Sequence, residues 1–322
     1  MQTARPGPTL SLRLAAIVVG LGALLALVFL VSKSDQISTQ LFNGLVLGAF
    51  YAIVALGLSL IMNLTGTINM AHGSFMTLSG YLAFAMVSRG TNFWFALVVA
   101  PLMTVVVGVL VERTLIRPLY QKEPIYSLLL TFGLSLVAEE IYHVIWGANG
   151  VPFAPPASLA GTIGLGFTTF PAFRLFIALV LLLMIVGLAL FLTRTRFGLR
   201  LRAAVQDTEM IAALGTNTQL LYMVNFALGI FLAGVAGVLA AGLLGLNPQS
   251  GNTLLMPAFV TVIIGGMGSL FGSIVGGALV GLATSLTTLW LPAASEVAMY
   301  ALMAVVLTIR PRGLFGEEGL FG

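Results

Sequence analysis

Residues 37–62 read ISTQLFNGLVLGAFYAIVALGLSLIM and contain no charged side chain. About 20 mostly apolar residues in a helix cross the roughly 30 Å hydrocarbon core of a bilayer, so this stretch predicts a membrane-spanning helix. The whole chain of 322 residues is 59% hydrophobic and 7% charged, whereas soluble domains average about 45–50% and 25%. The composition excludes a water-soluble fold and predicts an all-α integral membrane protein.

Working outward from this stretch, we expect one transmembrane domain over residues 1–322, a helical bundle of about 8–10 segments. Segments 73–88 and 254–267 are short for full spans, which leaves eight or nine spans as alternative counts. A cleaved signal peptide is an alternative for the first segment, but its apolar run is longer than such signals use. The predicted segments are 14–32, 37–62, 73–88, 93–112, 125–146, 173–193, 221–246, 254–267, 270–290 and 296–310.

The basic residues predict the orientation. With both termini in the cytoplasm, three of the fourteen Lys and Arg residues lie outside, namely Lys33, Arg89 and Arg174. This bias is what the positive-inside rule requires of an inner-membrane protein. The Pro- and Gly-rich stretch 147–172 then becomes a long periplasmic loop. The predicted cytoplasmic residues are Arg5, Arg13, Arg113, Arg117, Lys122, Arg194, Arg196, Arg200, Arg202, Arg310 and Arg312.

Other residue types limit the chemistry. The chain has no Cys and two His, which excludes disulfides and disfavours a metal centre. Its basic residues lie in short loops and not in a stripe, so we expect no nucleic-acid partner. The 37 Gly residues predict close helix packing.

Two glycine-containing stretches, 65–74 and 265–272, interrupt the helical pattern at membrane depth. Irregular backbone survives there only when it is buried in protein or lines a watery cavity, so both stretches are candidates for a transport pathway. A helix that restarts after a break presents free N–H groups that suit a carboxylate. Asn69, His72 and Ser74 could add hydrogen bonds; alternatively the glycines only allow close packing or a loop, with Asn69 or Ser74 as a helix cap. Both stretches carry a Gly-Ser pair followed by apolar residues, at 73–76 and 268–271. Because segments 37–62 and 221–246 also run in opposite predicted directions, this similarity indicates two inverted halves with the two breaks as counterparts.

Glu139, Glu140 and His143 lie near the outer end of segment 125–146, beside Trp146. Intramembrane ionisable groups are costly and often functional. We expect an interfacial anchor with Arg174 as partner, and a gate or proton relay is the alternative.

Residues 194–220 form the largest cytoplasmic insert. Leu201, Val205, Ile211 and Leu214 recur at near-helical spacing, which predicts a short amphipathic helix ending at Gly215. A plain interfacial linker is the alternative.

The chain resembles the permease subunits of branched-chain amino acid ABC importers, of the LivH type. The resemblance runs from about residue 38 to the end. It rests on five blocks in order: 69–76 (NMAHGSFM), 130–135 (LTFGLS), 200–217, 265–269 (GGMGS) and 310–316 (RPRGLFG).

The resemblance implies a second related permease subunit, two cytoplasmic ATPase subunits that bind ATP and Mg, and a periplasmic substrate-binding protein. No cofactor, catalytic residue or metal is implied in this chain. Relatives also carry urea, amides or aromatic acids, and the short N-terminal region favours amino acids. The residues predicted for the substrate pathway are Asn69, His72, Gly73, Ser74, Thr131, Gly265, Gly266, Gly268 and Ser269. The implied ATPase-coupling residues are Arg202, Ala203, Gln206, Asp207, Glu209, Ala212, Ala213 and Gly215.

Two other classes of function compete with this interpretation. An ion-coupled secondary transporter needs carboxylates near the bilayer midplane, and Glu139, Glu140 and Glu296 all look peripheral. A membrane-embedded enzyme needs an acid–base or nucleophile set, which this residue inventory does not supply. The chain has no G-x-x-x-x-G-K-[ST] phosphate loop, so an ATP-driven mechanism requires a partner.

Overall fold

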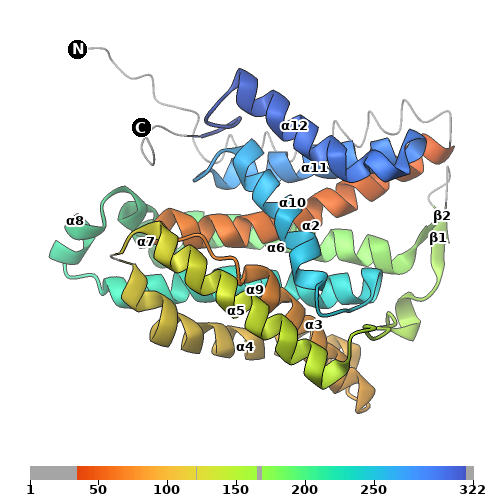
Figure 1. Ribbon diagram of the computed structural model, residues 1–322, viewed down its shortest axis with the longest axis horizontal. Helices are drawn as coiled ribbons and strands as arrows, with labels where there is room; N and C mark the ends of the chain where they lie inside the picture. Colours follow the sequence, from red (N-terminus) through yellow and green to blue (C-terminus); the bar gives the residue numbers. More distant parts are fainter. Residues whose placement is uncertain (1–34, 121, 165–168, 317–322) are drawn as a thin grey trace.

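A computed structural model describes residues 35–120, 122–164 and 169–316, and the expected first span at 14–32 lies outside them. The described chain is a bundle of helices (Figure 1). A two-stranded antiparallel hairpin, β1 (Thr162–Gly164) and β2 (Thr169–Pro171), lies in the long loop between two of them. The α-helices are α2 (Asp35–Thr65), α3 (His72–Ser88), α4 (Phe93–Val111), α5 (Pro124–Trp146), α6 (Ala172–Arg194), α7 (Arg196–Gln206), α8 (Thr208–Ala213), α9 (Thr218–Leu244), α10 (Ser250–Gly265), α11 (Leu270–Trp290) and α12 (Ser295–Ile309). Short turns of other helix types are η1 (Glu112–Ile116), η2 (Arg117–Leu119), η3 (Ala157–Leu159) and η4 (Pro292–Ala294).

Every apolar segment predicted after residue 34 forms a helix. The predicted and observed bounds differ most at segment 254–267, where helix α10 begins four residues earlier, at Ser250. Within the described ranges, seven helices are long and apolar enough to cross a membrane. The two short segments are helices of 17 and 16 residues, α3 and α10.

Burial separates central from peripheral helices. In the most apolar 18-residue stretch of each helix, the buried share is 78% for α2 and 67% for α9. The corresponding share is 17% for α5 and 11% for the stretch that contains α12. Lipid tails are as apolar as these side chains, so peripheral helices can expose them at no cost. The central pair therefore carries the protein core, and α5 and α12 present apolar faces to the bilayer.

Glycine allows a close contact between helices α2 and α11. A Cβ atom added at Gly48 would lie 2.6 Å from the Gly277 carbonyl oxygen, and one added at Gly44 would lie 3.0 Å from the Gly281 carbonyl oxygen. Real Cβ atoms essentially never lie under 3.0 Å from an atom elsewhere in the chain, so position 48 requires glycine, and Gly44 is at that limit. The predicted close packing is confirmed.

The described helices include two sets of four in the same order, α2–α5 and α9–α12, which we call the two halves of the bundle. Figure 1 shows α2 and α9 running in opposite directions across the molecule. They cross where Gly57 meets Gly229, and a Cβ atom added to either would lie 2.8 Å from the other's carbonyl oxygen. Each half begins with a long helix, a non-helical stretch and a short helix. The counterpart of residues 66–71 is therefore 245–249, and not the 265–272 stretch that the sequence suggested.

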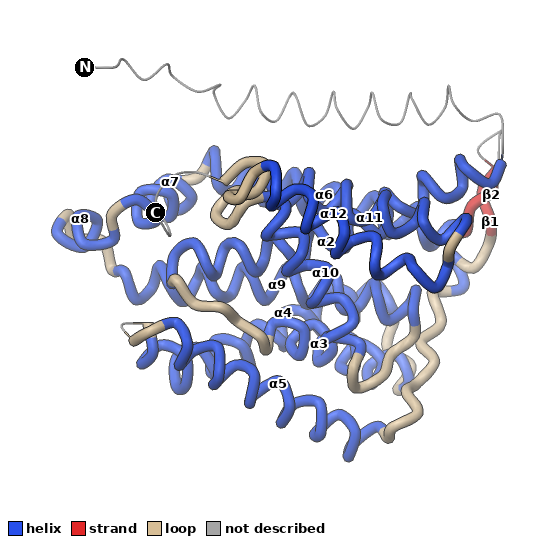
Figure 2. Tube along the Cα trace, turned by 45° about the horizontal axis from the view of Figure 1, so that its top comes forward, coloured by secondary structure: helices blue, strands red, loops and turns tan. Residues whose placement is uncertain are grey.

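The bundle has two distinct ends. In both Figure 1 and Figure 2, α7 and α8 lie at one end, which we call the α8 end, and β1 and β2 lie at the other, the hairpin end. At the hairpin end, Phe170 of β2 is buried against Phe42 of α2, with ring centroids 4.3 Å apart. This contact anchors the hairpin to the central helix.

Candidate functional site

The first break returns the chain into the bundle. Helix α2 ends at Thr65, Gly66 adopts a φ of +64°, and α3 begins at His72. The His72 ring lies beside Gly57, because a Cβ atom added at Gly57 would lie 2.9 Å from its Nε2 atom. Gly57 and Thr65 are eight residues apart on α2, about 12 Å at 1.5 Å per residue. Helix α3 therefore begins well inside the bundle.

Helix α5 holds this break in place. The Thr131 hydroxyl accepts a hydrogen bond from the Met70 N–H, at 3.0 Å, and lies 3.2 Å from the Ile68 carbonyl oxygen. The Tyr142 hydroxyl donates to the Ser74 carbonyl oxygen at 2.9 Å. Side-chain partners of this kind replace the helical bonds that backbone loses at membrane depth. Thr131 thus lies at the first break, beside Met70 and Ile68.

Two buried polar side chains lie at the start of α3. Asn69 is 3% exposed and His72 is 0% exposed. The His72 ring is near the Val54 carbonyl, yet neither its nitrogens nor the Asn69 amide atoms have a hydrogen-bond partner among the described residues. Leaving a buried polar group unpaired costs about 1–3 kcal/mol. These groups are therefore poised to bond to water or to a polar group that passes between the helices.

Neither predicted cap is used. The residue that precedes α3 is Ala71, and no side chain caps this helix. Ser74 lies inside α3, where its carbonyl oxygen accepts from Tyr142. The alternative that Asn69 or Ser74 serves as a helix cap is wrong.

The short helices α3 and α10 meet at their first turns. A Cβ atom added at Gly73 would lie 2.6 Å from the Gly251 carbonyl oxygen. Gly73 follows the buried His72, and Gly251 is the second residue of α10. The contact therefore joins the first break to the start of the other half's short helix.

The second break is a tight turn at the α8 end. Gly266 and Gly268 have φ values of +98° and +96°, which favour glycine. The Ser269 hydroxyl caps α11 by accepting from the Gly272 N–H at 3.0 Å. The C-terminal segment covers the end of α10, because Phe315 donates its N–H to the Gly265 carbonyl oxygen at 3.0 Å.

The two breaks lie at different depths. The Asn63 amide donates to the Gly268 carbonyl oxygen at 2.9 Å, which brings the second break to the end of α2. His72 lies beside Gly57, six residues, or about 9 Å, farther along α2. The structure thus places Gly265, Gly266, Gly268 and Ser269 at the edge of the bundle and Asn69, His72 and Gly73 inside it.

The predicted coupling region is two helices, not one. Asp207 interrupts the helix with φ −153° and ψ 97°, and its carboxylate accepts from the Met210 N–H at 2.8 Å, so it begins a new helix, α8. Val205 and Leu214 do not share a buried face with Leu201, because their exposed fractions are 43% and 73%. The prediction of one amphipathic helix ending at Gly215 is wrong. In both Figure 1 and Figure 2, α8 projects from the end of the bundle.

The acidic residues near the end of α5 have other partners than expected. Glu139 accepts hydrogen bonds from Gln249 at 2.7 Å and from Asn252 at 3.1 Å, and Glu140 lies 3.6 Å from His143. Arg174 donates instead to Asn43 of α2 at 2.6 Å. The predicted pairing with Arg174 is wrong, and Glu139 links α5 to the start of α10.

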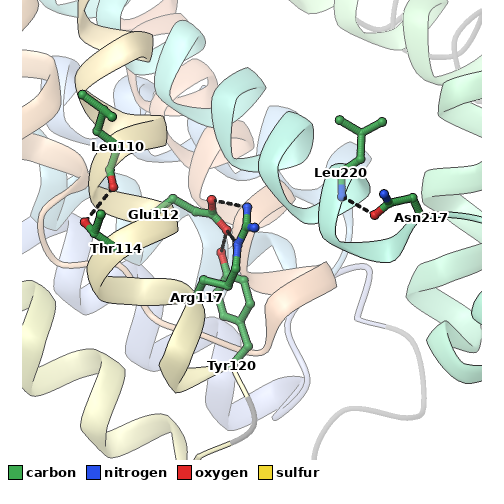
Figure 3. Close-up of polar contacts among 7 residues, drawn as sticks. All are labelled: Leu110, Glu112, Thr114, Arg117, Tyr120, Asn217 and Leu220. Atoms are coloured by element: carbon green, nitrogen blue, oxygen red, sulfur yellow. Dashed lines mark hydrogen bonds and ion pairs between the residues drawn. The ribbon is translucent and has the colours of Figure 1, made fainter.

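A buried ion pair that the sequence did not reveal lies at the end of α4, within the turns η1 and η2. Glu112 is 0% exposed, and its carboxylate accepts from Arg117 at 2.9 and 3.1 Å and from the Tyr120 hydroxyl at 3.1 Å (Figure 3). Burial, and secondly the Glu112 carboxylate, raises the pKa of Tyr120, so its hydroxyl remains a donor. The Tyr120 ring is 5.1 Å from that of Tyr222 on α9. This cluster fixes the end of α4 to the helix that follows α8.

The signal for this cluster in the sequence is weak. Glu112 follows nineteen uncharged residues of α4 and precedes Arg117 by five positions. An α-helix places residues three or four apart on one face, so a spacing of five does not suggest a pair. The π-helical turn of η1 changes this geometry and brings the two side chains together.

Comparison with known proteins identifies the family to which this helical bundle is similar. Residues 40–307 match the family model described as branched-chain amino acid transport system / permease component. The chain is 30% identical over 294 residues to the high-affinity branched-chain amino acid transport system permease protein LivH of Escherichia coli K12, covering 86% of this chain and 95% of that protein. It is 29% identical to BraD of Pseudomonas aeruginosa over the same shares of the two chains. It is also 27% identical to LivM of Escherichia coli K12, covering 82% of this chain and 67% of LivM.

No solved structure matches the chain. The family match covers most of the chain, including both halves of the bundle and the α7–α8 region. The chain belongs to the permease components of branched-chain amino acid transport systems and is a multi-pass membrane protein.

Proposed function

We propose that this chain is a permease subunit of an ATP-driven importer that moves branched-chain amino acids across the inner membrane. The family match over residues 40–307 is the observation that carries this conclusion. Relatives named LivH and LivM both resemble the chain, which supports assembly with a second, related permease. Two cytoplasmic ATPase subunits, which hold ATP and Mg, and a periplasmic binding protein complete the proposed importer.

The charges support a cytoplasmic location for the α8 end. Arg113, Arg117 and Lys122 follow α4 there, the four arginines between 194 and 202 lie in and beside α7, and Arg310 and Arg312 follow α12. Arg89 and Arg174 lie toward the hairpin end. This distribution follows the positive-inside rule. It supports a cytoplasmic C-terminus and a periplasmic loop at 147–172. The cytoplasmic N-terminus rests on the span predicted from the sequence at 14–32, which lies outside the described residues.

The α7–α8 region is the proposed docking site for an ATPase. Met210 and Leu214 are exposed apolar side chains, with exposed fractions of 57% and 73%, at the end of the molecule that we assign to the cytoplasm. Apolar residues exposed in this way suit a groove on a partner protein. The coupling residues remain Arg202, Ala203, Gln206, Asp207, Glu209, Ala212, Ala213 and Gly215, now divided between α7, α8 and their flanking residues.

ATP acts through the partner. A ligand biases two conformations only through its different affinity for them, so ATP must favour one arrangement of the ATPase pair. Movement of α8 then reaches α9 through the Gly215 turn and Asn217, whose side chain caps α9 by accepting from the Leu220 N–H at 3.0 Å. The contact between Tyr222 of α9 and Tyr120 then transmits this movement to the end of α4.

The proposed substrate pathway runs past the first break. Unpaired buried groups on Asn69 and His72, and the glycine crossing of α3 and α10, support it. The second break would lie at its cytoplasmic exit, because Gly268 is bonded to Asn63 at the end of α2. The residues proposed for the pathway are Asn69, His72, Gly73, Ser74, Thr131, Gly265, Gly266, Gly268 and Ser269.

Gentle purification of the tagged chain from its native membrane tests this assembly. Mass spectrometry should find subunits that carry a phosphate-binding loop, and a second multi-span protein, in stoichiometric amounts. Recovery of the chain alone, with ion-driven uptake activity, would overturn the importer in favour of a secondary transporter.

A further inference from the structure

A cavity of about 200 Å³ lies between α3, α9 and α10. Met76 of α3, Ala240 of α9 and Leu254 of α10 form its apolar walls, and Ser250 and Thr253 bring hydroxyl groups to it. Leu246, another lining residue, exchanges backbone hydrogen bonds of 2.7 and 3.3 Å with Val151 of the long loop. The cavity is therefore on the hairpin side of the pathway.

The lining selects for an uncharged occupant. Every residue around this cavity is apolar, Gly, Ser, Thr or Asn, so an ionised side chain placed in it would find no opposite charge. Burying a charge without a partner is very costly. An engineered apolar cavity of about 150 Å³ in another protein binds benzene, so this volume holds an aliphatic chain of three or four carbon atoms.

The position of the cavity links it to the proposed pathway. Its residue Ser250 precedes Gly251, which contacts Gly73, the residue after the buried His72. Beyond the contact, a second cavity beside Thr67 and Asn69 measures only about 10 Å³. The space is thus larger on the hairpin side of the Gly73–Gly251 contact than beside Thr67 and Asn69.

We infer that the larger cavity receives the side chain of the transported amino acid and selects small and branched aliphatic side chains by size. The inference rests on the proposed function. The glycine contact of α3 and α10 lies next to Ser250 of the cavity, and Asn69 and His72, with their unpaired groups, precede Gly73 at this contact.

Selective uptake by the reconstituted complete importer tests the size limit. Ala240→Leu adds three carbon atoms to the cavity wall and should lower the ratio of leucine uptake to alanine uptake at least about tenfold, since one methylene in an apolar pocket changes discrimination by about 10–200-fold. Retained alanine uptake shows that the variant is folded. Ala301→Leu, the same change on an exposed face of α12, should leave the ratio unchanged.

Thiol labelling gives a second measurement, because the chain has no Cys. Thr253→Cys in the complete importer should react with a membrane-impermeant thiol reagent, and leucine with the binding protein should slow the reaction about tenfold or more. Thr162→Cys, exposed on β1, should react without protection.

The outcomes separate the two proposals. Wild-type leucine uptake with an unchanged leucine-to-alanine ratio in Ala240→Leu, or with an unprotected Thr253→Cys, would overturn the side-chain cavity alone. A wild-type importer that takes up no aliphatic amino acid would overturn the proposed function and this inference with it.

Discussion

The ion pair at the end of α4 supports a quantitative prediction. Glu112 is fully buried, whereas the Arg117 side chain is 23% exposed. Arg117→Met leaves a buried carboxylate whose remaining side-chain partner, among the residues that the structure describes, is the Tyr120 hydroxyl. Breaking a buried pair from one side typically costs about 3–5 kcal/mol, so we expect a loss of this size in the free energy of unfolding.

Companion variants separate the contributions. Glu112→Gln leaves an unpaired arginine whose side chain reaches water. It should therefore lower the free energy of unfolding by less than Arg117→Met does, by about 1–3 kcal/mol. Tyr120→Phe removes one hydrogen bond of about 1 kcal/mol. The double variant Glu112→Gln/Arg117→Met has no buried charge and should be more stable than Arg117→Met alone.

Unfolding in mixed detergent micelles, followed by tryptophan fluorescence, measures these differences. A loss below about 1 kcal/mol for Arg117→Met, the range of solvent-exposed pairs, would refute the buried pair. A double variant less stable than Arg117→Met would also contradict the reasoning, because removing the stranded carboxylate should restore stability.

Three further predictions concern the coupling region, the helix crossing and the orientation. Asp207→Arg and Ala212→Arg should leave membrane insertion intact but reduce the recovery of the ATPase in pull-downs at least about tenfold. The reason is that a misplaced charge at an interface costs several kcal/mol. Normal ATPase recovery with both variants would contradict the docking site. Gly281→Val should destabilise the chain by about 1–3 kcal/mol or more, because the larger side chain overpacks against α2. The control Gly187→Val, which has open space around it, should not destabilise the chain. Equal melting temperatures for the two variants would contradict the close crossing. In intact cells, Thr162→Cys should react with an impermeant thiol reagent, and Lys122→Cys, exposed at the α8 end outside the proposed docking site, should react only after permeabilisation. The reverse pattern would invert the topology.

The apolar pattern was sufficient to predict the helices. Residues 37–62 and 270–290 are long uncharged runs, and the observed helices differ from them by at most three residues at either end. The start of α10 was misplaced because Ser250, Asn252 and Thr253 look like loop residues. In the structure, turns through Asn247 and Gln249 begin the helix there.

The site could be predicted only in part. Asn69, His72 and Gly73 stood out because they interrupt an apolar pattern, and the structure places them inside the bundle. Their contact with Gly251 joins positions far apart in the chain, and no local pattern encodes it. Asp207 was not recognised as a helix breaker because the flanking residues favour helix on both sides.

ATP-dependent leucine uptake into proteoliposomes is the most direct test of the central claim. The complex captured through this chain is reconstituted, with the binding protein on the substrate side and ATP on the opposite side. The proposed function requires uptake that stops when ATP or the binding protein is omitted. Leucine uptake that needs neither, and instead follows an imposed ion gradient, would contradict it.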